Sequence, residues 1–324
     1  MADEPIDLQI STMRYDHTMP LMDGRVQIEG VNLKPSRIPA MIFNEDSPYK
    51  SGAFGIGDLN VMYWLPAIEA GWPIIGLPLW IKRKPVYEYL WVRSDRGIDT
   101  PKDLEGKRVG SRPYRLSTTI WLKGFLQHRH GVDISKLRWV IWGSEVFPIH
   151  DSNAKIEPPA DEKKSVMDAL LDGEIDAMMV DISDGKAWDT LEASPQVKLL
   201  FPDYMAEDEK LYKETGIYAP AHMMVLNKKI DEEHPDLAGK IVDAFERAKQ
   251  IAYQEILDDR GGFATVYLRE ALKDQQAKWG DPWKYGISAN QREIDTFIQY
   301  NREQGLTRLD PAYEDIFAKS TLDT

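Results

Sequence analysis

Two histidines of this sequence stand where an imidazole could transfer protons. His17 follows Tyr15 and Asp16 just after the first predicted strand, and a neighbouring carboxylate can fix the tautomer of an imidazole and raise its proton affinity. His222 lies in the apolar stretch 219–224 of a predicted strand that runs between the two halves of the chain. For each histidine a structural alternative stays equally open: a solvated turn for His17 and a hydrogen-bonded core side chain for His222.

The segment 110–119 carries groups that bind anions. Ser111, Arg112, Tyr114 and Arg115 come directly before a predicted helix, and guanidiniums pair bidentately with carboxylates. The unpaired backbone N–H groups of a helix N-terminus attract anions as well. We expect this loop to bind a carboxylate, although a capped helix with surface arginines is the alternative.

Polar side chains also follow other predicted strands. Asp58 and Asn60 end one strand, and Asp181 follows another. The C-terminal ends of strands face the ligand crevice in open α/β sheets, but Asp and Asn at such positions also cap helices. We favour a cleft role for Asp58 and, slightly, helix capping for Asp181. Asp16, Asn60 and Asp181 are kept as binding candidates.

The elements that must position these residues alternate between strands and helices. This rhythm favours an α/β fold with largely parallel sheets, and the Pro-rich segment 154–161 is expected to be a polar connection. The predicted strands are 6–10, 33–38, 54–60, 74–79, 87–92, one beginning at 107, 137–142, one ending at 180, 197–201 and 220–227; the predicted helices are 61–71, 118–128, one ending near 173, 236–257, 262–279 and 291–303.

The length and the order of these elements predict two Rossmann-like lobes joined by two crossover strands. The chain has 324 residues, which exceeds one average domain. We expect lobe 1 to comprise residues 1–90 and 219–324, including a helical C-terminal extension, and lobe 2 to comprise residues 91–218. A ligand cleft between the lobes is the corresponding functional expectation.

The charge and the cysteine content of the sequence argue against several kinds of binding partner and chemistry. The net charge of −13 argues against nucleic acid or an anionic membrane as partner, and the lack of cysteine excludes disulfides and thiolate chemistry. No apolar run reaches the ~20 residues of a membrane span. The acidic start at residues 1–5 lacks the features of a secretion signal, so we expect a cytoplasmic protein. A homo-oligomer is left open.

Four common catalytic motifs are missing from the sequence. The sequence contains no Walker loop, no GxGxxG after the first strand, no HExxH and no GxSxG. Nucleotide-dependent, zinc-protease and serine-hydrolase functions therefore lose their usual support.

Several motifs of this sequence together form a recognisable pattern. They are residues 280–290, 300, 304–307 and 316–318 near the C-terminus, residues 15–18, 21–26 and 29–31 near the N-terminus, and residues 92–95, 97–98, 103–110, 114, 121, 124 and 222 between them. Together they resemble the 4,5-dihydroxyphthalate decarboxylase family. The resemblance runs nearly end to end, and its C-terminal motif is the most specific. It implies a fold like that of type II periplasmic binding proteins, with two Rossmann-like halves joined by two crossovers.

Three segments depart from the family pattern. Asp58 stands where a Glu is usual, Val86 and Tyr87 replace an Arg–His pair, and residues 112–115 read Arg-Pro-Tyr-Arg in place of Pro-Glu-Tyr-Gln. The resemblance therefore implies that the fold is conserved, whereas residues expected at the ligand cleft differ from the family pattern.

The resemblance implies a redox-neutral decarboxylation of a hydroxylated aromatic acid. A ring hydroxyl allows protonation at the carboxylate-bearing carbon, and CO2 then leaves as aromaticity returns. We expect His17 or His222 to be the acid and Asp58 with Tyr114 to orient the phenol, while Ser111, Arg112 and Arg115 bind a second carboxylate. No cofactor is expected.

Two alternatives stay open. Metal involvement is left open because Asp58, His17 and His222 could converge, although no ligand spacing argues for it. The competing function is a non-catalytic binding protein for an aromatic or other small anionic acid.

Overall fold

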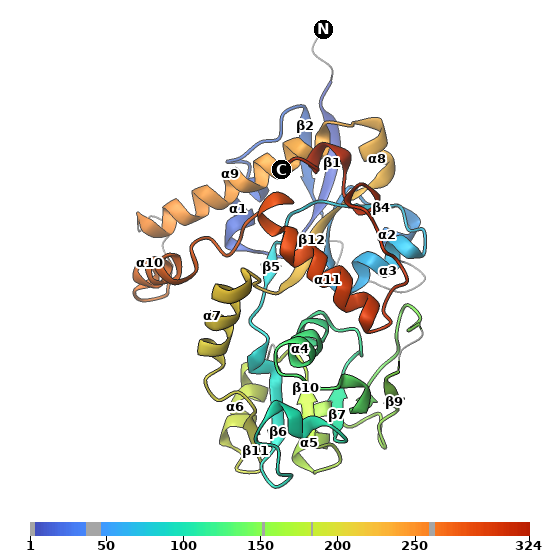
Figure 1. The fold of residues 1–324 in the computed structure, drawn as a ribbon. Coiled ribbons are helices and arrows are strands. Elements are labelled where there is room, and N and C mark those ends of the chain that lie inside the picture. Colours follow the sequence, from blue (N-terminus) through green and yellow to red (C-terminus); the bar gives the residue numbers. More distant parts are fainter. Residues whose placement is uncertain (1–3, 37–46, 151–152, 183, 259–262) are drawn as a thin grey trace. The chain divides into compact units, whose positions relative to one another are not determined.

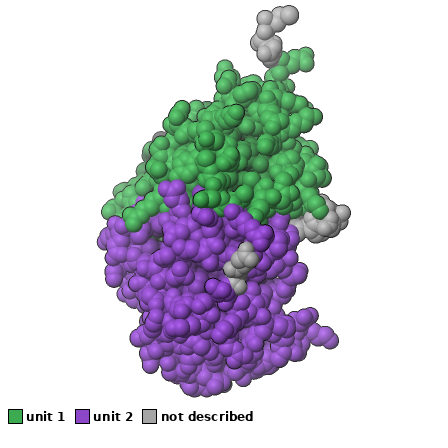
Figure 2. Space-filling view, turned by 45° about the vertical axis from the view of Figure 1, so that its right-hand side comes forward, with its two compact units in different colours: residues 1–83, 220–294, 309–324 green, residues 84–219, 295–308 purple. Residues whose placement is uncertain are grey.

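The computed structural model describes residues 4–36, 47–150, 153–182, 184–258 and 263–324. The chain divides into two compact units, coloured green and purple in Figure 2. Unit 1 comprises residues 1–83, 220–294 and 309–324, and unit 2 comprises residues 84–219 and 295–308.

This division differs from the expected lobes in two respects. The chain leaves unit 1 after residue 83 instead of 90, and the segment 295–308, expected in lobe 1, belongs to unit 2. The reason for the second difference is aromatic packing. Phe297 and Tyr300 lie with their ring centroids 5.4 and 5.8 Å from that of Trp121 in unit 2.

Unit 1 contains a mixed sheet with the strand order β2-β1-β3-β12-β4, and β5 pairs with β12 as well. The strands β1, β2 and β3 run parallel, whereas β12 is antiparallel to β3, β4 and β5 because it returns from a distant part of the chain. The sheet is therefore less parallel than expected. Its strands are β1 (Ile6–Ser11), β2 (Val31–Pro35), β3 (Ile56–Asn60), β4 (Ile74–Gly76), β5 (Lys82–Arg83) and β12 (Pro220–Asn227).

The long helix α9 (Leu237–Leu257) packs along the unit 1 sheet (Figure 1). Its Ile241 and Phe245 share one apolar core with Leu8 and Ile10 of β1. The other helices that lie wholly in this unit are η1 (Asp16–Thr18), α1 (Met19–Met22), α2 (Pro48–Ser51), η2 (Val61–Tyr63), α3 (Trp64–Glu69), α8 (Lys228–Glu233), α10 (Leu268–Trp279), η6 (Ser288–Asn290), α12 (Tyr313–Ile316) and η7 (Lys319–Thr321).

The C-terminal motif 280–290 surrounds two buried cations of unit 1. Lys249 Nζ of α9 lies 2.7 Å from Asp281 Oδ2 and 2.8 Å from the carbonyl oxygen of Trp283. The guanidinium of Arg83 donates to both carboxylate oxygens of Glu293 and to Asn290 Oδ1. Because buried charges need such partners, this motif has a structural role.

Unit 2 contains a second mixed sheet with the order β11-β6-β10-β7-β8-β9. The strand β6 is antiparallel to both neighbours, and the remaining pairs are parallel. The segment 154–161, expected as a connection, contributes the exposed edge strand β9, and residues 87–89 form the short helix η3 instead of strand. The strands are β6 (Leu90–Arg93), β7 (Arg108–Ser111), β8 (Arg138–Ile141), β9 (Lys155–Glu157), β10 (Ala177–Met179) and β11 (Val197–Leu199).

The central helix of unit 2 is α4 (Ser117–His128), of which residues 117–126 are buried. Gly124 is required there, because a Cβ at this position would lie 2.0 Å from the ring of Tyr300. The other helices are η3 (Tyr87–Tyr89), η4 (Pro101–Leu104), η5 (Ile134–Lys136), α5 (Val166–Leu171), α6 (Gly185–Ala193), α7 (Tyr204–Thr215) and most of α11 (Gln291–Glu303), whose first residues belong to unit 1.

In the described part of the chain, every helix is too short or too polar to span a bilayer.

Candidate active site

The strands β3 and β12 of unit 1 bring Asp58 and His222 together. In the antiparallel register Met224 lies opposite Asp58 and His222 lies opposite Asn60, so Asp58 and His222 are diagonal neighbours that can reach one another. His222 Nδ1 is 2.6 Å from Asp58 Oδ1. Both side chains are buried, with 4% and 0% of their residue surface exposed. The carboxylate therefore accepts the Nδ1 proton and leaves Nε2 as the second reactive nitrogen.

The second oxygen of Asp58 is held from the N-terminal side. Asp58 Oδ2 accepts the backbone N–H of Met13 at 3.2 Å and the hydroxyl of Tyr15 at 3.3 Å. The hydroxyl of Tyr49 donates to the backbone carbonyl of Asp58 at 2.8 Å. Burial, together with the charge of Asp58, raises the pKa of both phenols. Tyr15 and Tyr49 are therefore protonated donors that fix Asp58.

Asn60 has the capping role that its position allows. Its Oδ1 accepts the backbone N–H of Met62 at 3.1 Å and so caps η2. Its Nδ2 lies 3.5 Å from His222 Nε2. Asn60 is thus placed beside the reactive nitrogen while its oxygen is engaged in the cap.

His17 forms a separate imidazole–carboxylate pair in the same unit. His17 Nδ1 lies 3.0 Å from Asp16 Oδ1, and this hydrogen bond lowers the pKa of Asp16. The imidazole stacks on the ring of Tyr15 at a centroid distance of 5.5 Å. Its buried Nε2 has no hydrogen-bond partner among the described residues. Tyr15 therefore contacts both pairs, but the structure gives His17 no hydrogen bond to Asp58 or His222 within the described part.

In unit 2, the predicted anion-binding loop is largely occupied by its own interactions. Arg115 is fully buried, and its Nε lies 2.5 Å from Glu145 Oε2. Its Nη2 donates to the carbonyl oxygens of Phe147 and Pro148 at 2.7 and 2.9 Å. This guanidinium holds the 145–148 segment against the loop, while its buried Nη1 has no hydrogen-bond partner among the described residues. The expected role of Arg115 in binding a carboxylate stays a prediction.

Ser111 and Tyr114 are likewise used within unit 2. Ser111 Oγ donates to the carbonyl of Pro113 at 3.1 Å. The Tyr114 ring packs edge-on against Trp139 at a centroid distance of 5.3 Å, and its backbone N–H donates to Glu145 Oε1. Both residues are buried and shape the loop. The expected contact of Tyr114 with a phenol stays a prediction.

The groups of the loop that stay available are Arg112 and the first turn of α4. Arg112 is exposed. The N-cap residue of α4, Leu116, offers no side-chain hydrogen bond. The hydroxyl of Thr118 in the first turn is buried and has no hydrogen-bond partner among the described residues. These are the features that an anion bound at a helix N-terminus would use.

Asp181 pairs with Lys84, and its Oδ1 lies 2.5 Å from Lys84 Nζ. The capping role favoured for it is taken by Asp184, which accepts the N–H of Lys186 at the start of α6. The sequence pattern identified the correct loop but the wrong aspartate.

Lys123 was missed by the sequence analysis. It is completely buried in α4, where its Nζ donates to the carbonyl of Tyr114 at 3.0 Å and lies 3.3 Å from the centroid of the Tyr114 ring. Burial lowers the pKa of Lys123 well below its usual value. A lysine within the apolar run 120–126 was the signal in the sequence.

The described residues hold no group of three or more His, Asp or Glu side chains that could bind a metal ion. Of the three side chains whose convergence was left open, Asp58 and His222 lie together, whereas His17 pairs with Asp16.

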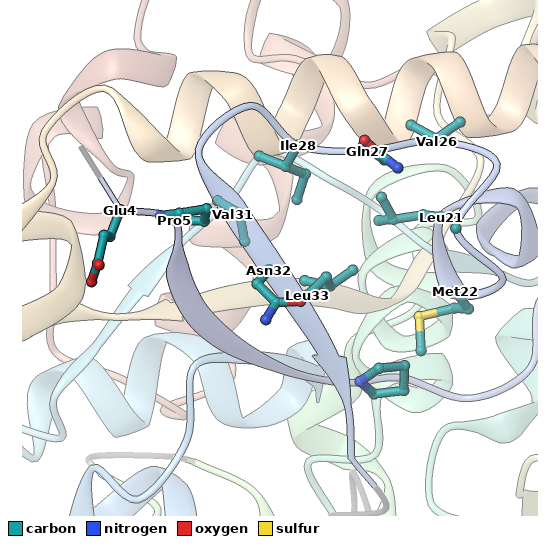
Figure 3. A pocket seen from close by; sticks show the side chains of 12 residues that line it. Glu4, Pro5, Leu21, Met22, Val26, Gln27, Ile28, Val31, Asn32 and Leu33 are labelled. Atoms are coloured by element: carbon teal, nitrogen blue, oxygen red, sulfur yellow. The ribbon is translucent and has the colours of Figure 1, made fainter. Parts of the chain in front are cut away.

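A surface pocket of about 660 Å³ lies elsewhere in unit 1, lined by residues of β2 and α1 and of the segments beside them (Figure 3). Leu21, Val26, Ile28 and Leu33 give it an apolar lining. None of the candidate site residues lines it, so it is separate from the Asp58–His222 pair.

Comparison with known proteins identifies the family. A family model described as NMT1/THI5 like matches residues 52–255. The 4,5-dihydroxyphthalate decarboxylase of Comamonas testosteroni is 30% identical over 332 residues, which cover 98% of this chain and 98% of that protein. The enzyme of the same name from Pseudomonas putida is 30% identical over 198 residues, covering 55% of this chain and 74% of the relative.

A solved structure supports the fold. The periplasmic aliphatic sulphonate-binding protein SsuA of Escherichia coli aligns over 97% of this chain and 92% of its own, with a TM-score of 0.57 and 14% identity. The chain thus has the expected α/β fold of the type II periplasmic-binding-protein class. It belongs to the 4,5-dihydroxyphthalate decarboxylase family, within the NMT1/THI5-like proteins, and is a carboxy-lyase.

Proposed function

We propose that this protein removes CO2 from a hydroxylated aromatic acid of the 4,5-dihydroxyphthalate type, with His222 as the proton donor. The observation that carries the proposal is the buried contact of 2.6 Å between His222 Nδ1 and Asp58 Oδ1. It supports a defined tautomer and orientation for the imidazole in a chain whose full-length relative is named as such a decarboxylase.

The reaction needs an acid because direct loss of CO2 would leave a localised aryl carbanion. Electron release from a ring hydroxyl instead lets the carbon that bears the carboxylate accept a proton. The C–C bond then breaks, its electron pair restores the aromatic ring, and CO2 leaves. The overall change replaces one carboxylate by one hydrogen, so no oxidant or reductant is consumed.

The chain's own residues would divide this work as follows. His222 delivers the proton from Nε2, and Asp58 stabilises the imidazolium through Nδ1–H. Tyr15 and the backbone N–H of Met13 hold Asp58 in place through Oδ2. Burial of the pair keeps water from competing for these hydrogen bonds and strengthens them.

In unit 2, we assign anion binding to Arg112 and the first turn of α4 and not to Arg115. Arg112 keeps an exposed guanidinium, whereas Arg115 is committed to Glu145. The exposed charge and the helix N-terminus both favour a carboxylate. The expected cleft between the lobes, the cytoplasmic location and the absence of nucleic-acid or membrane partners stay predictions.

The competing function is binding without turnover, and the likeness to a sulphonate-binding protein is the observation in its favour. A panel of aromatic acids separates the two functions. The purified chain is incubated with phthalate, 4-hydroxyphthalate, 4,5-dihydroxyphthalate and hydroxybenzoates, while CO2 release and ligand binding are both followed.

We expect CO2 only from acids whose hydroxyl group can donate electrons to the carboxylate-bearing carbon. Phthalate, which lacks a hydroxyl, should bind without reacting. Saturable binding of the hydroxylated acids with no CO2 from any of them would refute the proposal in favour of the binding function.

A further inference from the structure

Tyr15 and His222 bind the same carboxylate, that of Asp58. The Tyr15 hydroxyl lies 3.3 Å from Asp58 Oδ2, while His222 engages Asp58 Oδ1 at 2.6 Å. The phenol and the imidazole thus share one carboxylate, each at its own oxygen.

We infer that Tyr15 is a positioning residue of the proton donor, which sets the proton affinity of His222 through Asp58. The inference rests on the proposed function, because it assigns a role in that same site.

The physical basis is competition for the charge of one carboxylate. A hydrogen bond to a carboxylate stabilises its charged form and makes it a weaker partner for other donors. Donation by Tyr15 therefore reduces the support that Asp58 gives to a protonated His222. A weaker support makes the imidazolium a stronger acid, which favours proton delivery to a ring carbon.

Tyr15 is held firmly enough for this task. Its ring stacks on His17 and packs against the apolar core of unit 1. Burial and the charge of Asp58 raise the pKa of its phenol, so the hydroxyl stays a donor across the working pH range.

Other titratable groups neighbour this cluster and must be considered. Asp16 and His17 of η1 form their own pair next to Tyr15. Lys82 of β5 is the register partner of His222. Tyr49 of α2 reaches Asp58 from another side. None of these residues is changed in the variants below except Tyr49, which provides the control.

Tyr49 offers a matched control because it also presents a phenol to Asp58. Its hydroxyl donates to the backbone carbonyl of Asp58 at 2.8 Å and not to the carboxylate. Removing the Tyr49 hydroxyl perturbs the packing around Asp58, whereas removing the Tyr15 hydroxyl takes a hydrogen bond away from the Asp58 carboxylate.

The test follows the ring protons of His222 against pH by NMR in the free protein, with the resonance assigned through its loss in His222→Asn. In Tyr15→Phe we expect the titration midpoint to rise by about one pH unit, the size of one charge-assisted hydrogen bond. In the pH profile of kcat/KM, the midpoint of the decrease at high pH should move to higher pH by the same amount. Tyr49→Phe should leave both midpoints where they are in the parent.

A second variant covers the case in which Tyr15→Phe fails to fold. Replacing Tyr15 with 3-fluorotyrosine keeps the shape but makes the hydroxyl a stronger donor, so the midpoint should fall. An unchanged midpoint in the folded Tyr15 variants would overturn the inference, and so would an equal shift in Tyr49→Phe.

The two hypotheses fail in different ways. The NMR titration needs no turnover, so a shift found in a protein that releases no CO2 would reject the proposed function and leave the linkage between Tyr15 and His222 standing.

Discussion

The Asp58–His222 pair of unit 1 and the Glu145–Arg115 pair of unit 2 look alike in one respect. Each joins a buried cationic or titratable side chain to a carboxylate, at 2.6 and 2.5 Å. The difference lies in the cation. An imidazole changes charge near neutral pH and keeps a second nitrogen, whereas a guanidinium stays charged and offers only donors.

The surroundings of the two pairs follow from this difference. The remaining nitrogen of His222 faces only the amide of Asn60 at 3.5 Å among the contacts that the structure describes. Arg115 Nη2 instead donates to the carbonyl oxygens of Phe147 and Pro148, and its Nη1 is buried without a hydrogen-bond partner among the described residues. We conclude that the first pair can perform proton transfer, whereas the second stabilises a loop.

Replacement of His222 should give the largest effect. His222→Gln removes the proposed acid while keeping a similar volume and a hydrogen-bonding group near Asp58. We expect kcat to fall by about 1,000-fold, the usual contribution of a general acid, with the circular dichroism spectrum unchanged. The measurement is the initial rate of CO2 release at saturating substrate.

His17→Gln is the matched control for that variant, since it removes the other imidazole of the same unit. It should retain most of the parent rate. If His17→Gln loses the rate while His222→Gln keeps it, the role of acid passes to His17, as the sequence alone allowed.

Breaking the pair in unit 2 should cost stability instead of chemistry. Arg115→Met leaves Glu145 without its cation in a largely buried position, and we expect the free energy of unfolding to fall by about 3 kcal/mol. Urea unfolding measures it. Removing both partners in Arg115→Met/Glu145→Leu should restore part of the loss. If Arg115→Met unfolds with the same free energy as the parent, the Arg115–Glu145 pair does not stabilise the fold.

A third buried carboxylate, Asp208 of α7, extends the comparison because it lacks such a partner. Burial raises its pKa to about 7, and the charges of Glu88 and Glu207 act in the same direction, opposed by backbone hydrogen bonds from Val86 and Tyr87. Its Oδ2 has no hydrogen-bond partner in the described part of the chain.

The sign of its pH dependence follows from proton uptake. The folded chain keeps a proton on Asp208 that the unfolded chain releases near its ordinary pKa of 3.8. The stability from this group is therefore complete below about pH 4 and is lost as the pH rises through about 7. Between pH 5 and 7 we expect a loss of about 2 kcal/mol that Asp208→Asn does not show. Equal slopes in urea unfolding would contradict this.

The smallest effect is expected at the exposed end of the anion-binding loop. Arg112→Ala removes a solvent-accessible guanidinium, so KM should rise by about tenfold while the melting temperature stays the same. Arg138→Ala, which removes a half-exposed arginine of β8 in the same unit, should leave KM unchanged. A parent-like KM in Arg112→Ala would remove Arg112 from substrate binding.

Much of the fold could be predicted from local patterns. Strands such as β1 and β12 and the helices α4, α9 and α11 have clear periodicity or apolar runs, and the structure contains them near the expected bounds. The allocation of residues 295–308 could not be predicted in this way, because it depends on contacts of Phe297 and Tyr300 with distant Trp121.

For the site, too, the local sequence identified candidate residues but could not predict which of them contact one another. Asp58 and His222 were each identified from their strand positions, but their contact across 164 residues depends on the register of β12 on β3. The contact of Arg115 with Glu145 could not be predicted from local sequence, because Glu145 lies 30 residues away. Residue type indicated what each side chain could do, and only the tertiary structure determined which were already engaged.

Decarboxylation of 4,5-dihydroxyphthalate by the purified chain in D2O tests the role of His222 as proton donor most directly, with CO2 and the deuterium content of the product measured together. We expect one CO2 per product molecule and one deuterium at the ring carbon that carried the carboxylate, with both lost in His222→Gln. Tight binding of the acid without CO2, or undiminished turnover in His222→Gln, would contradict the proposal.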